Sequence, residues 1–127
     1  MLYITYRGYM KYRIYFFKEA DGTKPLAQFI KTLDLKLKAK VVTDLHLLEE
    51  LGNLAREPLS KPLDDGIFEL RTIEGGNIVR ILYFFDRDKI IVATNGFVKK
   101  KREKLRLMKL LWQKKEDKFI FQQESDI

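Results

Sequence analysis

An aromatic-rich apolar run, MKYRIYFF beginning at Met10, opens the patterned part of the chain. Tyr, Ile and Phe favour extended backbone, so this run predicts the first strand. The Asp21-Gly22 pair that follows is typical of a tight turn and closes the strand. Residues 1–9 are expected to be an N-terminal extension, with Met10 as an alternative start.

Helical spacing begins after this turn and predicts a short amphipathic helix. Thr23 is its candidate cap, and Pro25 lies in its first turn. Its apolar side chains recur at positions i, i+3, i+4 and i+7, which are Leu26, Phe29, Ile30 and Leu33.

A second, longer helix is predicted from Asp34 to Gly52. The Asp34 carboxylate can accept hydrogen bonds from the free amides of a first turn, and glycine is a common helix stop. His46 lies off the apolar face and is expected to be an ordinary surface histidine. The two helices are expected to pack as a hairpin. The apolar face of the second helix consists of Leu37, Val41, Leu45 and Leu48.

Strand patterns dominate from residue 67 onward. Residues 67–73 and 78–85 are rich in β-forming residues and flank a Gly-Gly pair, which predicts a hairpin. A polar turn then leads to a third run, KIIVATNGFV, whose nearly continuous apolar character predicts a strand covered on both faces. The stretch from Pro58 to Pro62 is expected to be a loop.

The C-terminal part of the chain combines basic residues with helical spacing, which predicts a terminal helix up to residue 118. Residues 119–127 show no clear period and are expected to fray. The order strand, two helices, three strands and basic helix predicts an α+β protein with a single domain over residues 10–118. The apolar residues of the terminal helix are Leu105, Met108, Leu111 and Trp112.

Composition excludes several kinds of chemistry. The 127 residues suit one domain, and the absence of cysteine excludes disulfides, thiolate metal sites and cysteine nucleophiles. A single histidine excludes His-rich zinc sites and mechanisms that need two imidazoles. No stretch approaches about 18 consecutive apolar residues, so no membrane span is predicted. We therefore expect a cytoplasmic protein that works without a metal or another cofactor.

The net charge of +7 is confined to the basic segment. Residues 99–118 hold ten basic and three acidic residues, which leaves fifteen of each sign in the rest of the chain. Such a concentrated positive segment is typical of proteins that bind polyanions, including nucleic acids. A solvated helix face, or a surface for an acidic partner, would explain the same charge.

The predicted hairpin places two arginines directly opposite each other. If the Gly-Gly pair forms its two-residue loop, Arg71 lies opposite Arg80 on the same face of the sheet. Like charges at opposed positions destabilise a sheet, so the pair needs either an acid or a bound anion to balance it. Glu69 shares this face and is the candidate acid. Guanidinium groups also match phosphate geometry as bidentate donors, which favours an anion site.

The sequence contains no P-loop, dinucleotide-binding glycine motif, metal-ligand cluster or serine-hydrolase motif. RNA can still be cleaved without metal or histidine, because its 2′-hydroxyl attacks the adjacent phosphorus while cations stabilise the developing charge. A lysine whose pKa is lowered by neighbouring cations can act as base or acid. The basic run at residues 99–102, directly after the third strand, would bring such lysines close to the arginines.

Four stretches resemble the HigB-like, phage-derived branch of the RelE superfamily of type II toxins: LLEELG at 47–52, REPLSKPLDDGIFELR at 56–71, GGNIVRILYFF at 75–85 and NGFVKK at 95–100. The resemblance implies a twisted, mainly antiparallel sheet with two packed N-terminal helices and a C-terminal helix. It implies an mRNA interferase, an endoribonuclease that usually cuts mRNA on the ribosome. It also implies a small helix-turn-helix antitoxin that represses the operon, so that operator DNA is contacted only through the complex.

The resemblance also assigns roles to individual residues. Arg71 and Arg80 correspond to arginines suited to binding the scissile phosphate, and Lys99 and Lys100 to lysines that supply charge or protons. Many relatives have histidine where this chain has Asn95, so acid–base chemistry would fall to a lysine or tyrosine. The remaining contacts to RNA are expected from Lys61, Glu69, Lys101, Arg102 and Lys104.

Two other interpretations of the residues remain open. The protein could be a non-catalytic RNA-binding module whose lysine-rich segment follows the phosphates. It could also be an interaction protein whose basic helix docks an acidic partner. Both catalysis and simple RNA binding weaken with salt, so only product formation separates them.

Overall fold

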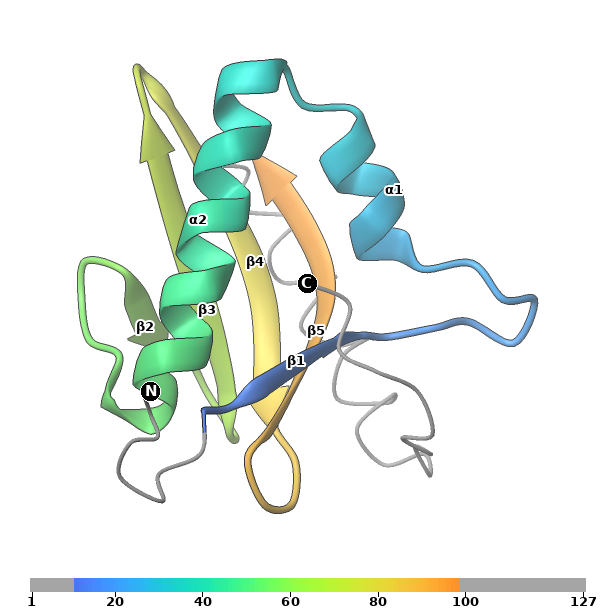
Figure 1. Ribbon diagram of the computed structural model, residues 1–127, viewed down its shortest axis with the longest axis vertical. Coiled ribbons are helices and arrows are strands. Elements are labelled where there is room, and N and C mark those ends of the chain that lie inside the picture. The colour runs from blue at the N-terminus through green and yellow to red at the C-terminus, as the bar shows by residue number, and fades with distance from the viewer. Residues whose placement is uncertain (1–10, 99–127) are drawn as a thin grey trace.

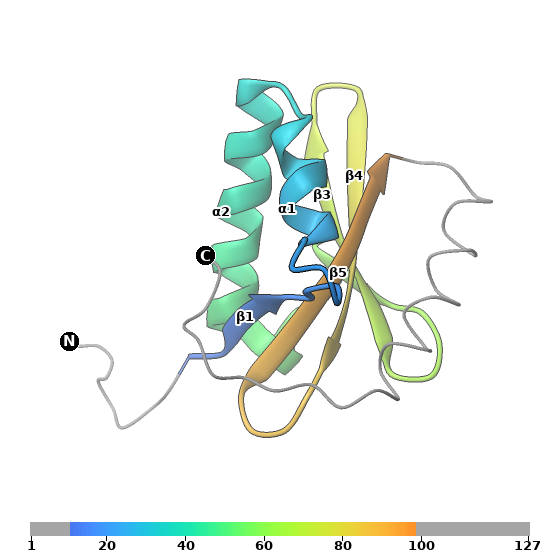
Figure 2. The ribbon, with the colours of Figure 1, turned by 90° about the vertical axis from the view of Figure 1, so that its right-hand side faces the viewer.

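A five-stranded sheet with two helices on one face forms the part of the chain that the structure, a computed structural model, describes, residues 11–98 (Figure 1). Figure 2 turns the molecule and shows α1 and α2 on the same side of the sheet. In chain order the elements are β1 (Arg13–Phe16), α1 (Pro25–Lys31), α2 (Leu35–Leu51), the 3-10 turn η1 (Gly52–Leu54), β2 (Ser60–Pro62), β3 (Ile67–Glu74), β4 (Asn77–Phe85) and β5 (Ile90–Val98).

The sheet is mixed but mainly antiparallel, with the strand order β1-β5-β4-β3-β2. The pairs β2–β3, β3–β4 and β4–β5 are antiparallel, whereas β1 pairs parallel with β5. Parallel strands cannot be joined by a tight turn, and here both helices and three strands separate them in the chain. The predicted α+β class and mainly antiparallel sheet are confirmed; the parallel edge pair was not predicted.

Helix α1 begins without a side-chain cap. Its N-cap residue is Lys24, and Pro25 occupies the first turn, where a missing N–H removes no helical hydrogen bond. The prediction that Thr23 caps this helix is wrong. The Thr23 hydroxyl and amide instead donate to Asp21 Oδ1, at 2.7 and 3.0 Å, because the aspartate closes the preceding turn with its own side chain.

Helix α2 has the ends that its sequence predicts. Asp34 Oδ1 accepts a hydrogen bond from the Leu37 amide at 2.8 Å, and the helix stops at Gly52, whose φ is 53°. His46 has a side chain that is 55% exposed, so its predicted surface position is confirmed. The two helices touch, but each packs more extensively on the sheet, α1 on β5 and α2 on β3.

Each face of the sheet carries its own buried cluster, because successive strand residues point to opposite faces. The larger cluster lies under the helices and includes Ile14, Leu70, Ile81 and Ile91. The second lies on the other face and comprises Ile67, Leu82, Phe84, Val92 and Phe97. Strand β5 contributes to both clusters, which confirms that it is buried on both faces.

The stretch from Pro58 to Pro62, predicted as a loop, contains the short edge strand β2. It pairs antiparallel with β3 and sets Lys61 opposite Glu69. The stretch was predicted as a loop because of its two prolines, which lack an N–H; proline is nevertheless tolerated at a sheet edge, and Pro62 ends β2 there. The expected N-terminal extension, the basic helix over 99–118 and the frayed tail over 119–127 lie outside the described residues.

Candidate functional site

Two arginines lie side by side on the sheet face that points away from the helices. A tight turn at Gly75, whose φ is 61°, joins β3 to β4, and the resulting register sets Arg71 opposite Arg80, as predicted. Directly opposed residues share a face, and both follow the alternation of the second buried cluster. The two guanidinium groups therefore emerge on the side opposite α1 and α2.

A buried carboxylate lies between these guanidinium groups. Glu69 precedes Arg71 by two residues in β3, on the same face, and is 0% exposed. Its Oε2 atom accepts a hydrogen bond from Arg80 Nη1 and lies 3.6 Å from Arg71 Nε. An ionised carboxylate is costly to bury unless it is paired, so the two arginines make this buried position tolerable for Glu69.

One carboxylate cannot neutralise two guanidinium groups. The three side chains keep one net positive charge, and the side chains of Arg71 and Arg80 are 24% and 16% exposed. The sequence left open whether an acid or an anion balances the arginines. Glu69 balances one of the two charges and leaves one that an anion from solution can balance.

Lys61 adds a third cation to the same face. The register of β2 sets it opposite Glu69, and opposed residues share a face. Its side chain is exposed. The structure thus brings Lys61, Arg71 and Arg80 from three neighbouring strands to one side of the sheet, around the Glu69 carboxylate.

Apolar side chains and one amide extend this face towards β5. Leu82 and Phe97 are 0% and 3% exposed, and Phe97 is the β5 partner of Arg80. A register shift after Leu82 sets Asn95 opposite Leu82 on the same face. Asn95 Oδ1 is buried and has no hydrogen-bond partner among residues 11–98. The arginines therefore lie beside an apolar floor that contains one unused acceptor.

Leu82 and Phe97 were not among the residues predicted for the site. Alternation along β4 from Arg80 could have found Leu82. Phe97 depended on the shifted register between β4 and β5, for which the Asn-Gly pair inside a strand is only a weak signal.

The strand tyrosine nearest in sequence to the arginines lies on the other face. The Tyr83 hydroxyl shares a hydrogen bond with the Ser60 hydroxyl in the core beneath the helices. Burial raises the pKa of Tyr83 to about 12, so the phenol stays protonated at neutral pH. The sheet separates Tyr83 from the arginines, and it cannot exchange protons with a ligand bound there.

The lysines predicted to complete the site, together with Arg102, lie outside the described residues: Lys99, Lys100, Lys101 and Lys104. Strand β5 ends at Val98, one residue beyond the partner of Arg80, so the chain leaves the described region beside the arginine pair.

No group of three or more His, Asp or Glu side chains within residues 11–98 is arranged to hold a metal ion. In the same part of the chain, no helix is long and apolar enough to cross a membrane.

Comparison with known proteins gives one family match. No curated protein matches the chain. The model of the family described as phage-derived Gp49-like proteins (DUF891) matches residues 28–118, a span that runs from within α1 past the end of β5 and includes Lys61, Glu69, Arg71 and Arg80. With more than half of its length matched, the chain belongs to the phage-derived Gp49-like (DUF891) family.

Proposed function

We propose that this protein is the toxin of a type II toxin–antitoxin system, an endoribonuclease of the HigB-like branch of the RelE superfamily. The observation that carries the proposal is the arginine pair, in which two guanidinium groups share one buried carboxylate and keep a positive charge at the surface. Membership in a phage-derived family and the sequence resemblance to HigB-like toxins support it.

The proposed reaction is a transesterification that needs no metal ion. The 2′-oxygen of RNA attacks the adjacent phosphorus, so that a P–O2′ bond forms while the P–O5′ bond breaks. The products are a 2′,3′-cyclic phosphate and a 5′-hydroxyl end. A base must remove the 2′-proton, and an acid must protonate the departing 5′-oxygen. Lys99 and Lys100 are the residues proposed for these transfers.

Arg71 and Arg80 would bind the non-bridging oxygens of the scissile phosphate. Negative charge on these oxygens grows in the transition state, so guanidinium groups already held in place stabilise it more than the substrate. Glu69 is fully buried and would orient the two arginines rather than touch RNA. Lys61, Lys101, Arg102 and Lys104 would hold the RNA backbone.

The partners follow from the same proposal. The substrate is mRNA on the ribosome, and a helix-turn-helix antitoxin neutralises the toxin. Operator DNA would be bound only through the toxin–antitoxin complex. A short neighbouring gene that encodes a helix-turn-helix protein would supply the antitoxin for a co-expression test.

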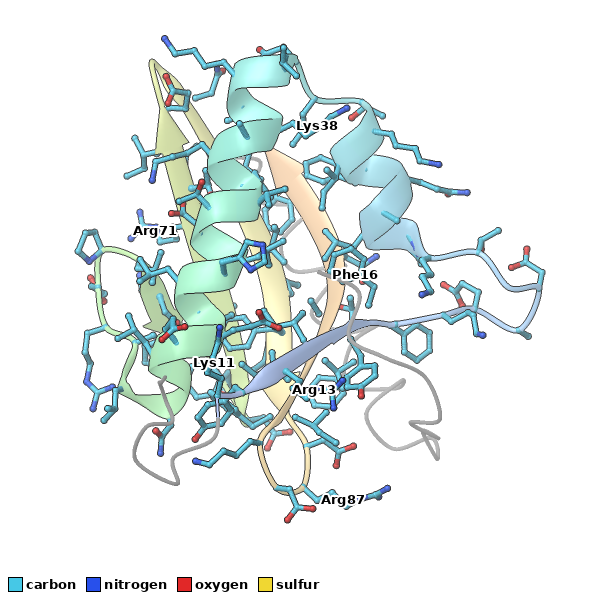
Figure 3. The ribbon with its side chains drawn as sticks, in the orientation of Figure 1. Lys11, Arg13, Phe16, Lys38, Arg71 and Arg87 are labelled. Carbon is cyan, nitrogen blue, oxygen red and sulfur yellow. The ribbon has the colours of Figure 1, made fainter. Side chains whose placement is uncertain are left out.

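The first test compares wild type, Arg71→Ala/Arg80→Ala and Arg87→Ala during inducible expression in bacteria, with mapping of new mRNA 5′ ends. Wild type should arrest growth and produce discrete cuts inside translated codons. Loss of both arginines should lower cleavage by at least about 100-fold, since each supplies charge to the transition state. Arg87 lies in the exposed turn between β4 and β5, away from Arg71, and serves as the matched arginine control (Figure 3).

If the double variant, expressed at the same level as wild type, still arrests growth, then the two arginines are not part of the catalytic site. Soluble wild-type protein that binds RNA without producing new 5′ ends would favour the non-catalytic module instead. Soluble protein that neither binds nor cuts RNA would favour a basic surface for an acidic partner.

A further inference from the structure

An apolar groove of about 390 Å³ lies between the two helices, on the face of the sheet away from the arginines. Phe16 of β1 and Leu45 of α2 form its floor and are 6% and 1% exposed. Ala27, Ile30 and Val42 form its walls, and Val42 is 38% exposed. Figure 3 labels Phe16 below the gap between α1 and α2. A groove with this lining offers a place for large apolar side chains.

One lysine and one histidine, whose Nδ1 atom lies 3.5 Å from Glu49 Oε1, stand at the rim of this groove. Lys31 comes from α1 and is exposed, and His46 comes from α2 with a side chain that is 55% exposed. An occupant that carries carboxylates next to its apolar side chains would complement both the lining and the rim.

Two stretches of the chain lie outside residues 11–98, namely 1–10 and 99–127, and only the last nine residues combine large apolar side chains with carboxylates and no basic residue. Residues 1–10, MLYITYRGYM, contain Arg7 and no acid, and residues 99–118 hold ten basic and three acidic residues. Residues 119–127, FIFQQESDI, contain three consecutive large apolar side chains followed by Glu124 and Asp126, with no basic residue.

The intervening chain is long enough to reach the groove. Strand β5 ends under α1, because a Cβ on Gly96 would lie 2.4 Å from the Phe29 ring. The connecting stretch of 20 residues, 99–118, would span about 30 Å even if it were entirely helical. That length exceeds the radius of gyration of about 12 Å for a domain of this size.

We propose that residues 119–127 dock into the groove between α1 and α2. The aromatic side chains of Phe119 and Phe121 occupy the apolar groove. Glu124 and Asp126 lie at its rim, beside Lys31 and His46. Because the occupant belongs to the same chain, it faces the groove at an effective concentration of about millimolar, and a modest intrinsic affinity suffices. This docking is independent of RNA cleavage, and loss of one would leave the other untouched.

The absence of native cysteine allows a direct test in the full-length chain. Val42→Cys in the groove wall is combined with Gln122→Cys, which leaves both phenylalanines in place. Leu47→Cys with Gln122→Cys is the matched control, since Leu47 lies on the same helix, is 42% exposed against 38% for Val42, and does not line the groove. The rate of intramolecular disulfide formation is measured by thiol alkylation and mass spectrometry at low protein concentration.

A docked tail holds the two cysteines within disulfide range, so the Val42 pair should close about tenfold or more faster than the Leu47 pair. Adding Phe119→Ser and Phe121→Ser should bring the rate of the Val42 pair down to that of the control. Adding Glu124→Lys and Asp126→Lys should slow it at low salt.

Equal rates for the two pairs would overturn the proposal, because a tail that samples the surface freely reaches both positions. Disulfides that form mainly between molecules would assign the groove to a second copy and also overturn it. Disulfide formation at an unchanged rate after the phenylalanine or acid substitutions would also overturn the proposal, because it would show that these side chains do not hold the tail in the groove.

Discussion

At the scale of single residues, Glu69 positions the two arginines and balances part of their charge. Its carboxylate is buried in β3 and is held by Arg71 and Arg80, and it holds them in turn at fixed positions on the sheet. Without it, two guanidinium groups would face each other across neighbouring strands, which is unfavourable. The same arrangement fixes the arginines before any anion arrives, so little ordering is left to the binding step.

Glu69→Gln should therefore lower the free energy of unfolding by about 2–4 kcal/mol, because it keeps the shape of the side chain but leaves the arginines without their counter-charge. Urea unfolding measures the change. Glu74→Gln in the same strand is the control, since Glu74 pairs at 3.5 Å with Lys36, which is 83% exposed, and such surface pairs contribute little. Equal losses in the two variants would contradict a structural role for the Glu69 charge.

A second prediction at this scale concerns the Tyr83 phenol and the stability of the protein at alkaline pH. Burial raises the pKa of Tyr83 to about 12 from the ordinary value of 10.0, so at alkaline pH the folded state retains a proton that the unfolded state releases. This contribution to stability is fully present below pH 10.0 and is lost as the pH rises through about 12.

Stability curves of wild type and Tyr83→Phe between pH 8 and 12 test this directly. Tyr83→Phe should be less stable than wild type by about 1 kcal/mol at pH 8, because it leaves the Ser60 hydroxyl without its partner. It should lose less stability on going to high pH, by about 2–3 kcal/mol. Parallel curves for the two proteins would show that the phenol does not titrate as its burial demands.

At the scale of elements, a glycine in β5 sets how closely α1 approaches the sheet. Gly96 lies under this helix, and a Cβ at that position would come within 2.4 Å of the Phe29 ring and 3.2 Å of Leu26. Glycine weakens a strand by itself, so its presence inside β5 indicates close approach of another element. The short helix α1, which has no side-chain cap, depends on this contact for its position.

Gly96→Ala should accordingly destabilise the protein by about 1–3 kcal/mol, since the added methyl group forces the helix away from β5. Gly76→Ala in the hairpin loop is the matched control, because a Cβ there meets no atom of the described part of the chain within 4 Å. It should change stability by less than about 0.5 kcal/mol. Thermal unfolding followed by circular dichroism distinguishes the two. A Gly96→Ala protein as stable as the control would mean that α1 shifts at no cost.

At the scale of the whole molecule, the sheet separates two surfaces of different chemistry. Both helices lie on one face of the sheet (Figure 2). The apolar groove lies between these helices, and the arginines and Lys61 lie on the opposite face. Strand β5 belongs to both, because it is buried on its two sides and lies between β1 and β4. A ligand on the arginine face and an occupant of the groove can therefore bind without touching the same side chains.

Local pattern alone was enough for much of this fold. The limits of α2 follow from Asp34 and Gly52, and the register of the β3–β4 hairpin follows from its Gly-Gly loop. These features depend on residues that are close in the chain, and turn chemistry and side-chain periodicity act at that range. The opposed arginines and the position of Glu69 beside them were predictable for the same reason.

Tertiary structure decided what distant segments do together. The parallel pairing of β1 with β5 joins segments far apart in the sequence, so no local pattern specifies it. The edge strand β2 and the shifted register at Asn95 belong to pairs of consecutive strands, but neither has a local pattern that marks it clearly. The sharing of the Glu69 carboxylate by two arginines could not be predicted from the register alone, because it also depends on how deeply the side chains are buried. The sequence by itself determined which residues face each other across one hairpin, whereas the tertiary structure determined how much of their charge remains at the surface, because burial and distance set that charge.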